Sequence, residues 1–465
     1  MKRLCILALI GLFAFSSATP ARAENGALKL PPFKKIRLNN GVTLLLMQHH
    51  EVPIISLNFI VRAGSAGDPA GREGTASATA ALLRKGTKSR SADQISNELD
   101  FVGGQLATDA TFDYSNGTAE FVKKDIARGL DLVADVLLNP TFPQAEVTKL
   151  LTQRIDEIKA AKDQAQSVIG NYFRAYLYGS HPYGRPPGGD EKSNAEITRD
   201  DVVKFYQTYY TPGNTILAVV GDFEIGEMER TLTTRFGSGK TSAETRVKLK
   251  EAPAFVGKKL LLVDKPDSTQ TFFQIGNLGI ARTNPDRVFV QVINTLFGGR
   301  FTSMLNTELR IKTGLTYGAR SSFIQHQTPG PFVISTYTRN ETTEKAIDMT
   351  LEILKRLHEK GVTEEDLKSA KTYLKGQFPP TIETSDQLAD LLAQLEFHGL
   401  DASDVNGYTT KIDSMTMADA QRVIKQYFPV ENLAFVLIGK AGEIEPVVKK
   451  YAPTIDRKAI GQPGF

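Results

Sequence analysis

The stretch DVVKFYQTYYTPGNTILAVVGDFE at residues 201–224 is echoed by DAQRVIKQYFPVENLAFVLIGKAGE at residues 419–443. In both copies an amphipathic helix pattern runs into an apolar strand pattern. Residues 214–221 and 432–439 have the same spacing from Asn to Gly, and an aromatic pair precedes each at the same distance. The echo indicates that one structural unit occurs twice in the chain.

A second echo lies upstream of each copy, where RGLDLVADVL at residues 128–137 resembles KAIDMTLEIL at residues 345–354. The two pairs have nearly the same offset, which disfavours chance similarity between amphipathic units. Runs of strands and runs of helices, rather than strict alternation, favour an α+β fold. The sequence therefore predicts two duplicated α+β domains of about 200 residues each, in which an antiparallel sheet packs with helices.

The first unit begins with a predicted β-hairpin, because Asn39-Asn40-Gly41 separates the strand patterns KKIRL and VTLLLM. Ser91 and Gln94 form a predicted capping box at the start of a helix with one apolar side. Further strands are predicted over residues 54–61, 105–111 and 114–121, and helices over residues 71–85, 124–138, 143–163 and 167–177.

The first residues have the order of a secretory signal peptide: Lys2 and Arg3, an apolar stretch over residues 4–15, and then Ala21-Arg22-Ala23. The apolar stretch is too short to favour the alternative, an uncleaved membrane anchor. We therefore expect residues 1–23 to be removed and the mature protein to be periplasmic or secreted. No later apolar run is long enough for a membrane span.

The charge and cysteine content of the mature chain exclude several classes of protein. The formal net charge is +4, but Lys2, Arg3 and Arg22 all belong to the signal peptide. The remaining chain is nearly neutral and lacks the clustered Lys and Arg of a nucleic-acid-binding protein. The single cysteine, Cys5, is also removed, so disulfides contribute nothing.

Residues 238–256 are charged and polar, contain Gly, Ser and Pro, and form the predicted linker between the two units. This division gives an N-terminal domain over residues 24–237 and a C-terminal domain over residues 257–465.

Four motifs occur in one order along the duplicated chain: NNGVTLLL at 39–46, HPYGRPPGG at 181–189, YYTPGNTILAVVGDF at 209–223, and GGRFTSMLNTELRIKTGLTYGARSSF at 298–323. Together they resemble the pitrilysin/insulinase family of zinc peptidases and its mitochondrial processing-peptidase relatives, over about residues 34–451. The resemblance implies two peptidase-like domains that form a clamshell around an extended peptide.

Catalytic members of that family carry H-x-x-E-H on a helix, just ahead of a stretch that resembles LLRKGT at residues 82–87. Two histidines four residues apart share a helix face and bind one Zn²⁺, while the glutamate deprotonates the bound water. The matching positions here are Ser77, Ala80 and Ala81, and no two of the six histidines are spaced four apart. The resemblance therefore implies a degenerate zinc site.

In active relatives a glutamate on a later helix supplies the third zinc ligand, and Glu157 in QRIDEIKAAKDQ resembles that position. Without two nitrogen ligands Glu157 cannot hold zinc, and an ordinary solvated helix glutamate is the alternative. We expect no metal site and no catalytic residue in this chain alone.

Arg310 and Tyr317 lie in LRIKTGLTY at residues 309–317, and the resemblance implies that they grip the substrate near the scissile carbonyl. A guanidinium and a phenol both donate to a carbonyl oxygen or an oxyanion. The alternative is structural, with the arginine in an ion pair and the tyrosine packed below it. Gly314 and Gly318 flank Tyr317 and would let the backbone approach a ligand closely.

The segment GGQLATDATFDYS at residues 103–115 resembles the family's edge strand that pairs with substrate. A bound peptide would add to it as a further strand. An ordinary interior strand is the alternative.

The leading hypothesis is a noncatalytic, substrate-binding subunit of an exported heteromeric zinc metallopeptidase that acts on peptides. Zinc and H-x-x-E-H would belong to a partner subunit of the same family, so this chain would hold no cofactor and be inactive alone. The alternatives are a stand-alone peptide-binding or scaffold protein, and hydrolysis with Ser77 as nucleophile. Ser77 lacks a nearby His or Lys and a G-x-S-x-G elbow.

Overall fold

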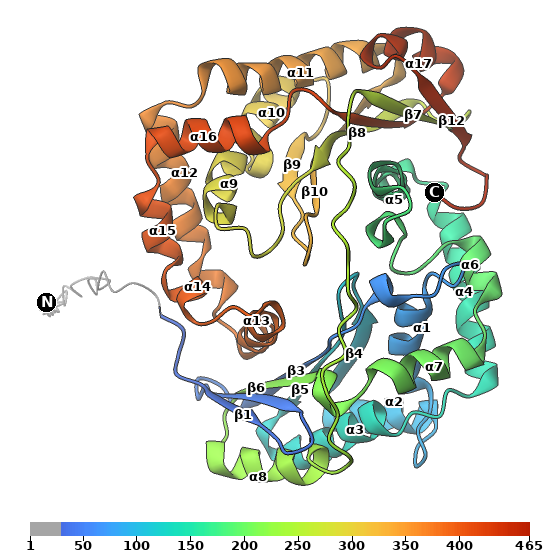
Figure 1. Cartoon of the computed structure of the whole chain (residues 1–465), viewed down its shortest axis with the longest axis vertical. Helices are drawn as coiled ribbons and strands as arrows, with labels where there is room; N and C mark the ends of the chain where they lie inside the picture. The colour runs from blue at the N-terminus through green and yellow to red at the C-terminus, as the bar shows by residue number, and fades with distance from the viewer. Residues whose placement is uncertain (1–28) are drawn as a thin grey trace, which may run out of the picture.

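The computed structural model describes residues 29–465, so the expected signal peptide lies outside the described residues. Two six-stranded sheets lie at opposite ends of the molecule, the first at the bottom and the second at the top of Figure 1. Helices cover the outer face of each sheet (Figure 1). This arrangement confirms the predicted α+β class.

The strands divide evenly between the two sheets. The first sheet has the order β1-β2-β6-β3-β5-β4 and contains β1 (Lys34–Arg37), β2 (Thr43–Gln48), β3 (Ile54–Val61), β4 (Gln105–Ala110), β5 (Ser115–Val122) and β6 (Thr215–Gly221). The second has the order β12-β7-β11-β8-β10-β9 and contains β7 (Lys259–Asp264), β8 (Gln270–Leu278), β9 (Arg320–Phe323), β10 (Pro331–Arg339), β11 (Ala434–Gly439) and β12 (Ile455–Ala459).

The helices follow the same division. The first half contains α1 (Thr75–Leu82), α2 (Ala92–Val102), α3 (Ile126–Leu138), α4 (Gln144–Ala161), α5 (Ala165–Tyr178), α6 (Glu191–Glu196), α7 (Arg199–Tyr209) and α8 (Ile225–Phe236). The second half contains α9 (Arg287–Asn294), α10 (Met304–Asn306), α11 (Thr343–Lys360), α12 (Glu364–Gln377), α13 (Ser385–His398), α14 (Ser403–Asn406), α15 (Tyr408–Ser414), α16 (Met417–Tyr427) and α17 (Ala441–Val448).

The two sheets repeat one topology. Five strands in the order β2-β6-β3-β5-β4 correspond to β7-β11-β8-β10-β9, and corresponding neighbours run in the same relative direction. The sixth strand differs, because β1 is antiparallel to β2 whereas β12 is parallel to β7. Each of the two echoed sequence stretches forms a helix and the strand after it, α7 with β6 and α16 with β11.

The sheets are mixed rather than purely antiparallel, which corrects one detail of the prediction. β2 and β6 run parallel, as do β7 and β11. A parallel pair needs a long crossover connection, and most of each half separates the two strands in sequence. The apolar runs of such interior strands carry no mark of strand direction.

The helix starts repeat as well. Thr198 before α7 and Thr416 before α16 each accept from the backbone N–H of an aspartate three residues later, and both form capping boxes. Ser91 and Gln94 form the predicted capping box of α2. Local sequence therefore fixes where these helices begin.

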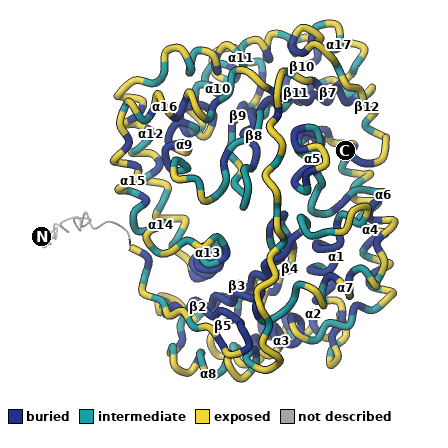
Figure 2. Tube along the Cα trace, viewed as in Figure 1, coloured by how far each residue is buried: buried dark blue, intermediate teal, exposed yellow. Residues whose placement is uncertain are grey.

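One helix of each half packs on the sheet of the other half (Figure 1). α5 lies against β8 and β11 and buries Tyr172 and Phe173 in the core of the second sheet. α13 lies against β3 and β6 and buries Leu388 and Leu392 on the first sheet. Figure 2 shows buried residues along the strands and along both helices. Each half therefore completes a core of the other.

Residues 237–258 form neither helix nor strand and run from the lower to the upper half in Figure 1. The Asn214 side chain donates to the Thr245 carbonyl at 3.0 Å and accepts from the Thr245 N–H at 2.6 Å. Asn40 donates to the Ser238 carbonyl at 3.0 Å. These bonds fasten the segment to the first half.

Over residues 29–465, no helix combines the length and the apolar character needed to cross a membrane.

Candidate functional site

Helix α1 carries the three positions that match the zinc motif, Ser77, Ala80 and Ala81. The helix begins after Gly74, whose φ of 106° lies in the left-handed region that glycine tolerates. Asp68 caps the first turn, because its carboxylate accepts from the N–H groups of Gly74 and Ala76 at 2.8 Å each. Ala80 is fully buried in an apolar cluster.

Arg154 of α4 lies beside Ser77. Its Nη2 donates to the Ser77 Oγ at 2.9 Å, and its Nη1 donates to the Gly74 carbonyl at 3.4 Å. α1 and α4 pack against each other. The guanidinium is therefore held between the first turn of α1 and the α4 backbone.

Carboxylates surround this guanidinium. Burial lowers the pKa of Arg154, and the negative charges of Asp109, Glu157 and Asp68 oppose that change. Arginine keeps its proton in proteins, so a permanent cation lies at the degenerate zinc site. Arg154 was not predicted as a site residue, although its position three residues before Glu157 places the two side chains on one face of the predicted helix.

Glu157 lies on the exposed side of α4 and accepts from the Gln153 Nε2 at 2.7 Å. Its negative charge raises the pKa of Arg154, and Arg154 in turn contacts Ser77. The fold therefore places the predicted residue of α4 and those of α1 on either side of the Arg154 side chain.

The residues at this place do not fit Zn²⁺. Ser77 offers a neutral hydroxyl that already accepts from Arg154, and alanines at 80 and 81 offer no ligand. A guanidinium also repels a divalent cation. In the part of the chain that the structure describes, no three His, Cys, Asp or Glu side chains gather as a possible metal site.

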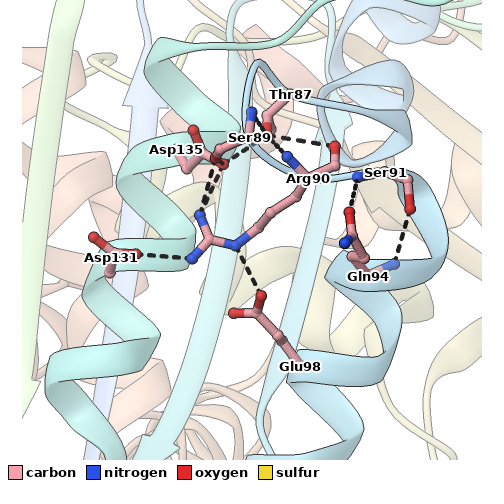
Figure 3. A network of polar contacts seen from close by, with 8 residues as sticks. All are labelled: Thr87, Ser89, Arg90, Ser91, Gln94, Glu98, Asp131 and Asp135. Carbon is pink, nitrogen blue, oxygen red and sulfur yellow. Dashed lines mark hydrogen bonds and ion pairs between the residues drawn. The ribbon is translucent and has the colours of Figure 1, made fainter.

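A polar network fixes the loop that leaves α1 (Figure 3). Asp135 of α3 accepts from Thr87 Oγ1 at 2.6 Å, Ser89 Oγ at 2.7 Å and Arg90 Nη1 at 2.9 Å. Burial would raise the pKa of Asp135, but these hydrogen bonds outweigh it and lower the pKa. The network therefore anchors the segment after the degenerate motif to α3.

Arg310 and Tyr317 line one cavity of 480 Å³ in the second half. Arg310 lies in η7 (Thr307–Lys312), a π-helical turn, and the second wall of the cavity contains η6 (Thr295–Gly299), another π-helical turn. π-Helical turns are rare in proteins, and those that occur often lie at functional sites. Gln166 and Ile169 of α5 close the cavity from the first half.

Neither predicted binding residue has the contacts that a purely structural role would give it. Tyr317 is 79% exposed. Arg310 stacks on Phe301, with its Cζ 4.9 Å from the ring centre, and forms no ion pair with residues 29–465. The nearby Glu308 instead pairs with Lys312 at 3.1 Å and Arg356 at 3.0 Å.

The predicted peptide-binding strand is an edge strand. β4 pairs only with β5 at the end of the first sheet. Arg84 donates to the Leu106 carbonyl at 2.9 Å, so one backbone acceptor of β4 is already used within the chain.

The fold and these two sites define a homologue of two-domain zinc peptidases. Residues 44–191 match the family model described as insulinase (peptidase family M16), and residues 196–374 match the model described as the peptidase M16 inactive domain. The chain belongs to this insulinase-like peptidase family, as the sequence motifs predicted.

The chain is also similar to individual members. It is 27% identical to the uncharacterized zinc protease ML0855 of Mycobacterium leprae, over 87% of this chain and 91% of that protein. It is 23% identical to the uncharacterized zinc protease YmxG of Bacillus subtilis, over 88% and 99%. A crystal structure described as a peptidase M16 inactive domain from Pseudomonas fluorescens shares the fold, with a TM-score of 0.82, 24% identity, and coverage of 92% of this chain and 99% of that one.

Proposed function

We propose that this chain is the noncatalytic, substrate-binding subunit of an exported heteromeric zinc metallopeptidase that acts on peptides. One observation carries the proposal: Arg310 and Tyr317 line an open cavity in which no carboxylate of residues 29–465 pairs with the guanidinium, while Arg154 lies beside the positions that resemble the zinc motif. Binding groups are present and the groups that would activate water are missing.

The two binding residues supply donors. Arg310 stacks on Phe301 through the face of its guanidinium, which leaves its in-plane N–H groups free for a peptide carbonyl oxygen. The exposed Tyr317 hydroxyl adds a further donor. Two such donors suit a carbonyl whose oxygen gains negative charge during hydrolysis. The backbone of the edge strand β4 offers main-chain hydrogen bonds that do not depend on peptide sequence.

The missing chemistry would come from a second polypeptide of the same family that carries H-x-x-E-H and a signal peptide. Zinc would be bound by that partner and not by this chain. Both polypeptides would meet in the periplasm or outside the cell, consistent with the basic, apolar and A-x-A order of residues 1–23.

The experiment is affinity purification of the tagged mature chain from the exported fraction, followed by mass spectrometry and a peptidase assay. We expect an H-x-x-E-H protein in near-equal amount and a chelator-sensitive activity that neither chain has alone. Chelator-sensitive hydrolysis by this chain alone would overturn the proposal. Peptide binding without any peptidase partner would establish the stand-alone binding protein instead.

A further inference from the structure

The cavity that contains Arg310 has a strongly one-sided charge. Arg300, Arg310 and Arg320 line it, and no Asp or Glu is among its lining residues. Within residues 29–465 none of the three arginines forms an ion pair, whereas Arg90, Arg287 and Arg422 all have carboxylate partners. Arg300 and Arg310 are half-buried and Arg320 is exposed. Three guanidiniums on one cavity without a lining carboxylate give it a positive charge that suits an anion.

Arg300 shows the same deficit in its hydrogen bonds. Its Nη1 donates to Ser369 Oγ at 3.0 Å, but its Nε is shielded from solvent and has no partner. Tyr373 lies under the guanidinium, with the Cζ 5.9 Å from the ring centre. Tyr373 and Phe301 thus each cover one face of Arg300 and Arg310. Within residues 29–465, the Nη2 group of Arg300 and the N–H groups of Arg310 have no hydrogen-bond acceptor.

Arg320 approaches from another element. It is the exposed first residue of β9, the edge strand of the second sheet. The Asn294 side chain accepts from the hydroxyl of the neighbouring Ser321 at 2.6 Å and donates to the Ser321 carbonyl oxygen at 3.0 Å. These two hydrogen bonds fix the start of β9. Phe272 and Tyr337 stack at 5.2 Å beside the cavity and give it an apolar wall. Three arginines from different elements therefore line one partly apolar cavity, where charge-assisted bonds are strong.

We propose that this cavity binds a carboxylate of the peptide, so that the subunit selects acidic peptides, with Arg300 and Arg320 as specificity-determining residues beside Arg310. The inference rests on the proposed peptide-binding function and names its substrate class. Planar guanidiniums match a carboxylate through two parallel N–H···O bonds. The carboxylate is that of an Asp or Glu side chain or of the peptide C-terminus.

The test measures peptide affinity by fluorescence anisotropy on the purified mature chain without a partner. One Glu is moved along an otherwise uncharged ten-residue peptide, and each peptide has a Gln twin and both free and amidated C-termini. We expect the best Glu peptide, or the free C-terminus, to bind roughly tenfold more tightly than its neutral twin, the scale of one charge-assisted hydrogen bond. If the Glu-to-Gln change causes the larger loss of affinity, the carboxylate is that of a side chain. If amidation causes the larger loss, the carboxylate is that of the peptide C-terminus.

Three variants connect that preference to the cavity. R300Q combined with R320Q should reduce the preference to about twofold or less, and salt should weaken it in wild type. R457Q removes the same charge from β12, at the opposite edge of the same sheet, and should keep the preference. If the doubly neutral variant folds poorly, R300K combined with R320K replaces it in the test. This variant retains both charges and should keep part of the preference for the charged peptide.

Equal affinity for charged and neutral twins, no binding of any charged peptide, or a preference that survives R300Q with R320Q would overturn the inference. None of these results depends on a peptidase partner. The subunit proposal is decided separately by co-purification and by activity of the mixed chains.

Discussion

The Arg154 guanidinium donates a 2.9 Å hydrogen bond to the hydroxyl of Ser77, the residue at the first histidine position of the zinc motif. At the positions that resemble the zinc motif, the chain therefore differs from H-x-x-E-H by this added guanidinium as well as by the absence of two imidazoles and one glutamate. A fixed positive charge lies beside α1, and the negative charges of Asp109 and Glu157 stabilise it.

This relationship predicts how the zinc site can be restored. Ser77→His, Ala80→Glu and Ala81→His together supply the motif, and Glu157 supplies the third ligand position. With Arg154 retained, we expect weak zinc binding, because the guanidinium and Zn²⁺ repel each other at short range. Adding Arg154→Leu should strengthen zinc binding by at least ~100-fold, since two such charges a few ångström apart repel by several kcal/mol even at a high effective dielectric constant. Competition with a chromophoric chelator measures the affinity.

Arg154→Leu alone is the matched control and should bind no more zinc than wild type. Circular dichroism must show that the triple and quadruple variants are folded. Equal zinc affinity in folded triple and quadruple variants would contradict the role given to Arg154. Absence of zinc binding in a folded quadruple variant would contradict the assignment of Glu157.

Arg310→Ala and Tyr317→Phe should lower hydrolysis by the reconstituted complex without disturbing assembly. If both donors act on the carbonyl oxygen as it gains charge, the loss appears in kcat more than in KM. Removing one such donor costs about 10²–10³-fold, and the phenol change should fall at or below that range. Arg457→Gln, on a remote edge of the second sheet, serves as control. Wild-type kinetics in both variants of a complex that elutes intact would make the pair structural.

Local patterns predicted most of the elements in the first half. The strand expected over residues 54–61 is β3 with those bounds, and Ser91 and Gln94 cap α2 as expected. These features depend on neighbouring residues, through side-chain alternation and capping geometry. The helix expected over residues 71–85 begins only at Thr75, because Gly71 and Gly74 have φ of 77° and 106°.

The sequence did not reveal the contacts between distant segments. No helix was predicted over residues 385–398, which form α13. The helix expected over residues 167–177 is α5, but an amphipathic pattern does not identify the surface it packs on. Arg154 was missed for the same reason, because its partner Ser77 is 77 residues away in the chain. The unpaired state of Arg310 likewise depends on Glu308 being taken by Lys312 and Arg356.

The C-terminal residues fasten the two halves together, and this predicts a stability effect at Lys162. The Lys162 side chain is 6% exposed. Its ammonium pairs with Glu191 and donates to the carbonyl oxygens of Gln462 at 2.7 Å and Gly464 at 3.3 Å. Lys162→Met leaves Glu191 buried without its cation, which typically costs 3–5 kcal/mol. Urea unfolding should show a loss of about that size.

Adding Glu191→Gln to Lys162→Met should recover part of the lost stability, because the neutral amide no longer needs a buried counter-ion. Lys34→Met, which removes an exposed ion pair with Glu229, is the control and should cost less than about 1 kcal/mol. Equal losses for Lys162→Met and Lys34→Met would show that the tail contact adds nothing.

His398, the last residue of α13, predicts a loss of stability in mild acid. Burial and, to a smaller extent, the positive charges of Arg282, His326 and Arg246 together lower the pKa of His398 to about 4, against the opposing charge of Asp404. Between pH 6.5 and about 4 the unfolded chain therefore binds a proton that the folded chain does not. The contribution of His398 is fully present above pH 6.5 and falls by about 2 kcal/mol at pH 5. His398→Gln should flatten this part of the curve of unfolding free energy against pH. If His398→Gln loses as much stability as wild type between pH 7 and pH 5, the His398 imidazole takes up its proton over the same pH range in the folded protein as in the unfolded chain, which contradicts the prediction.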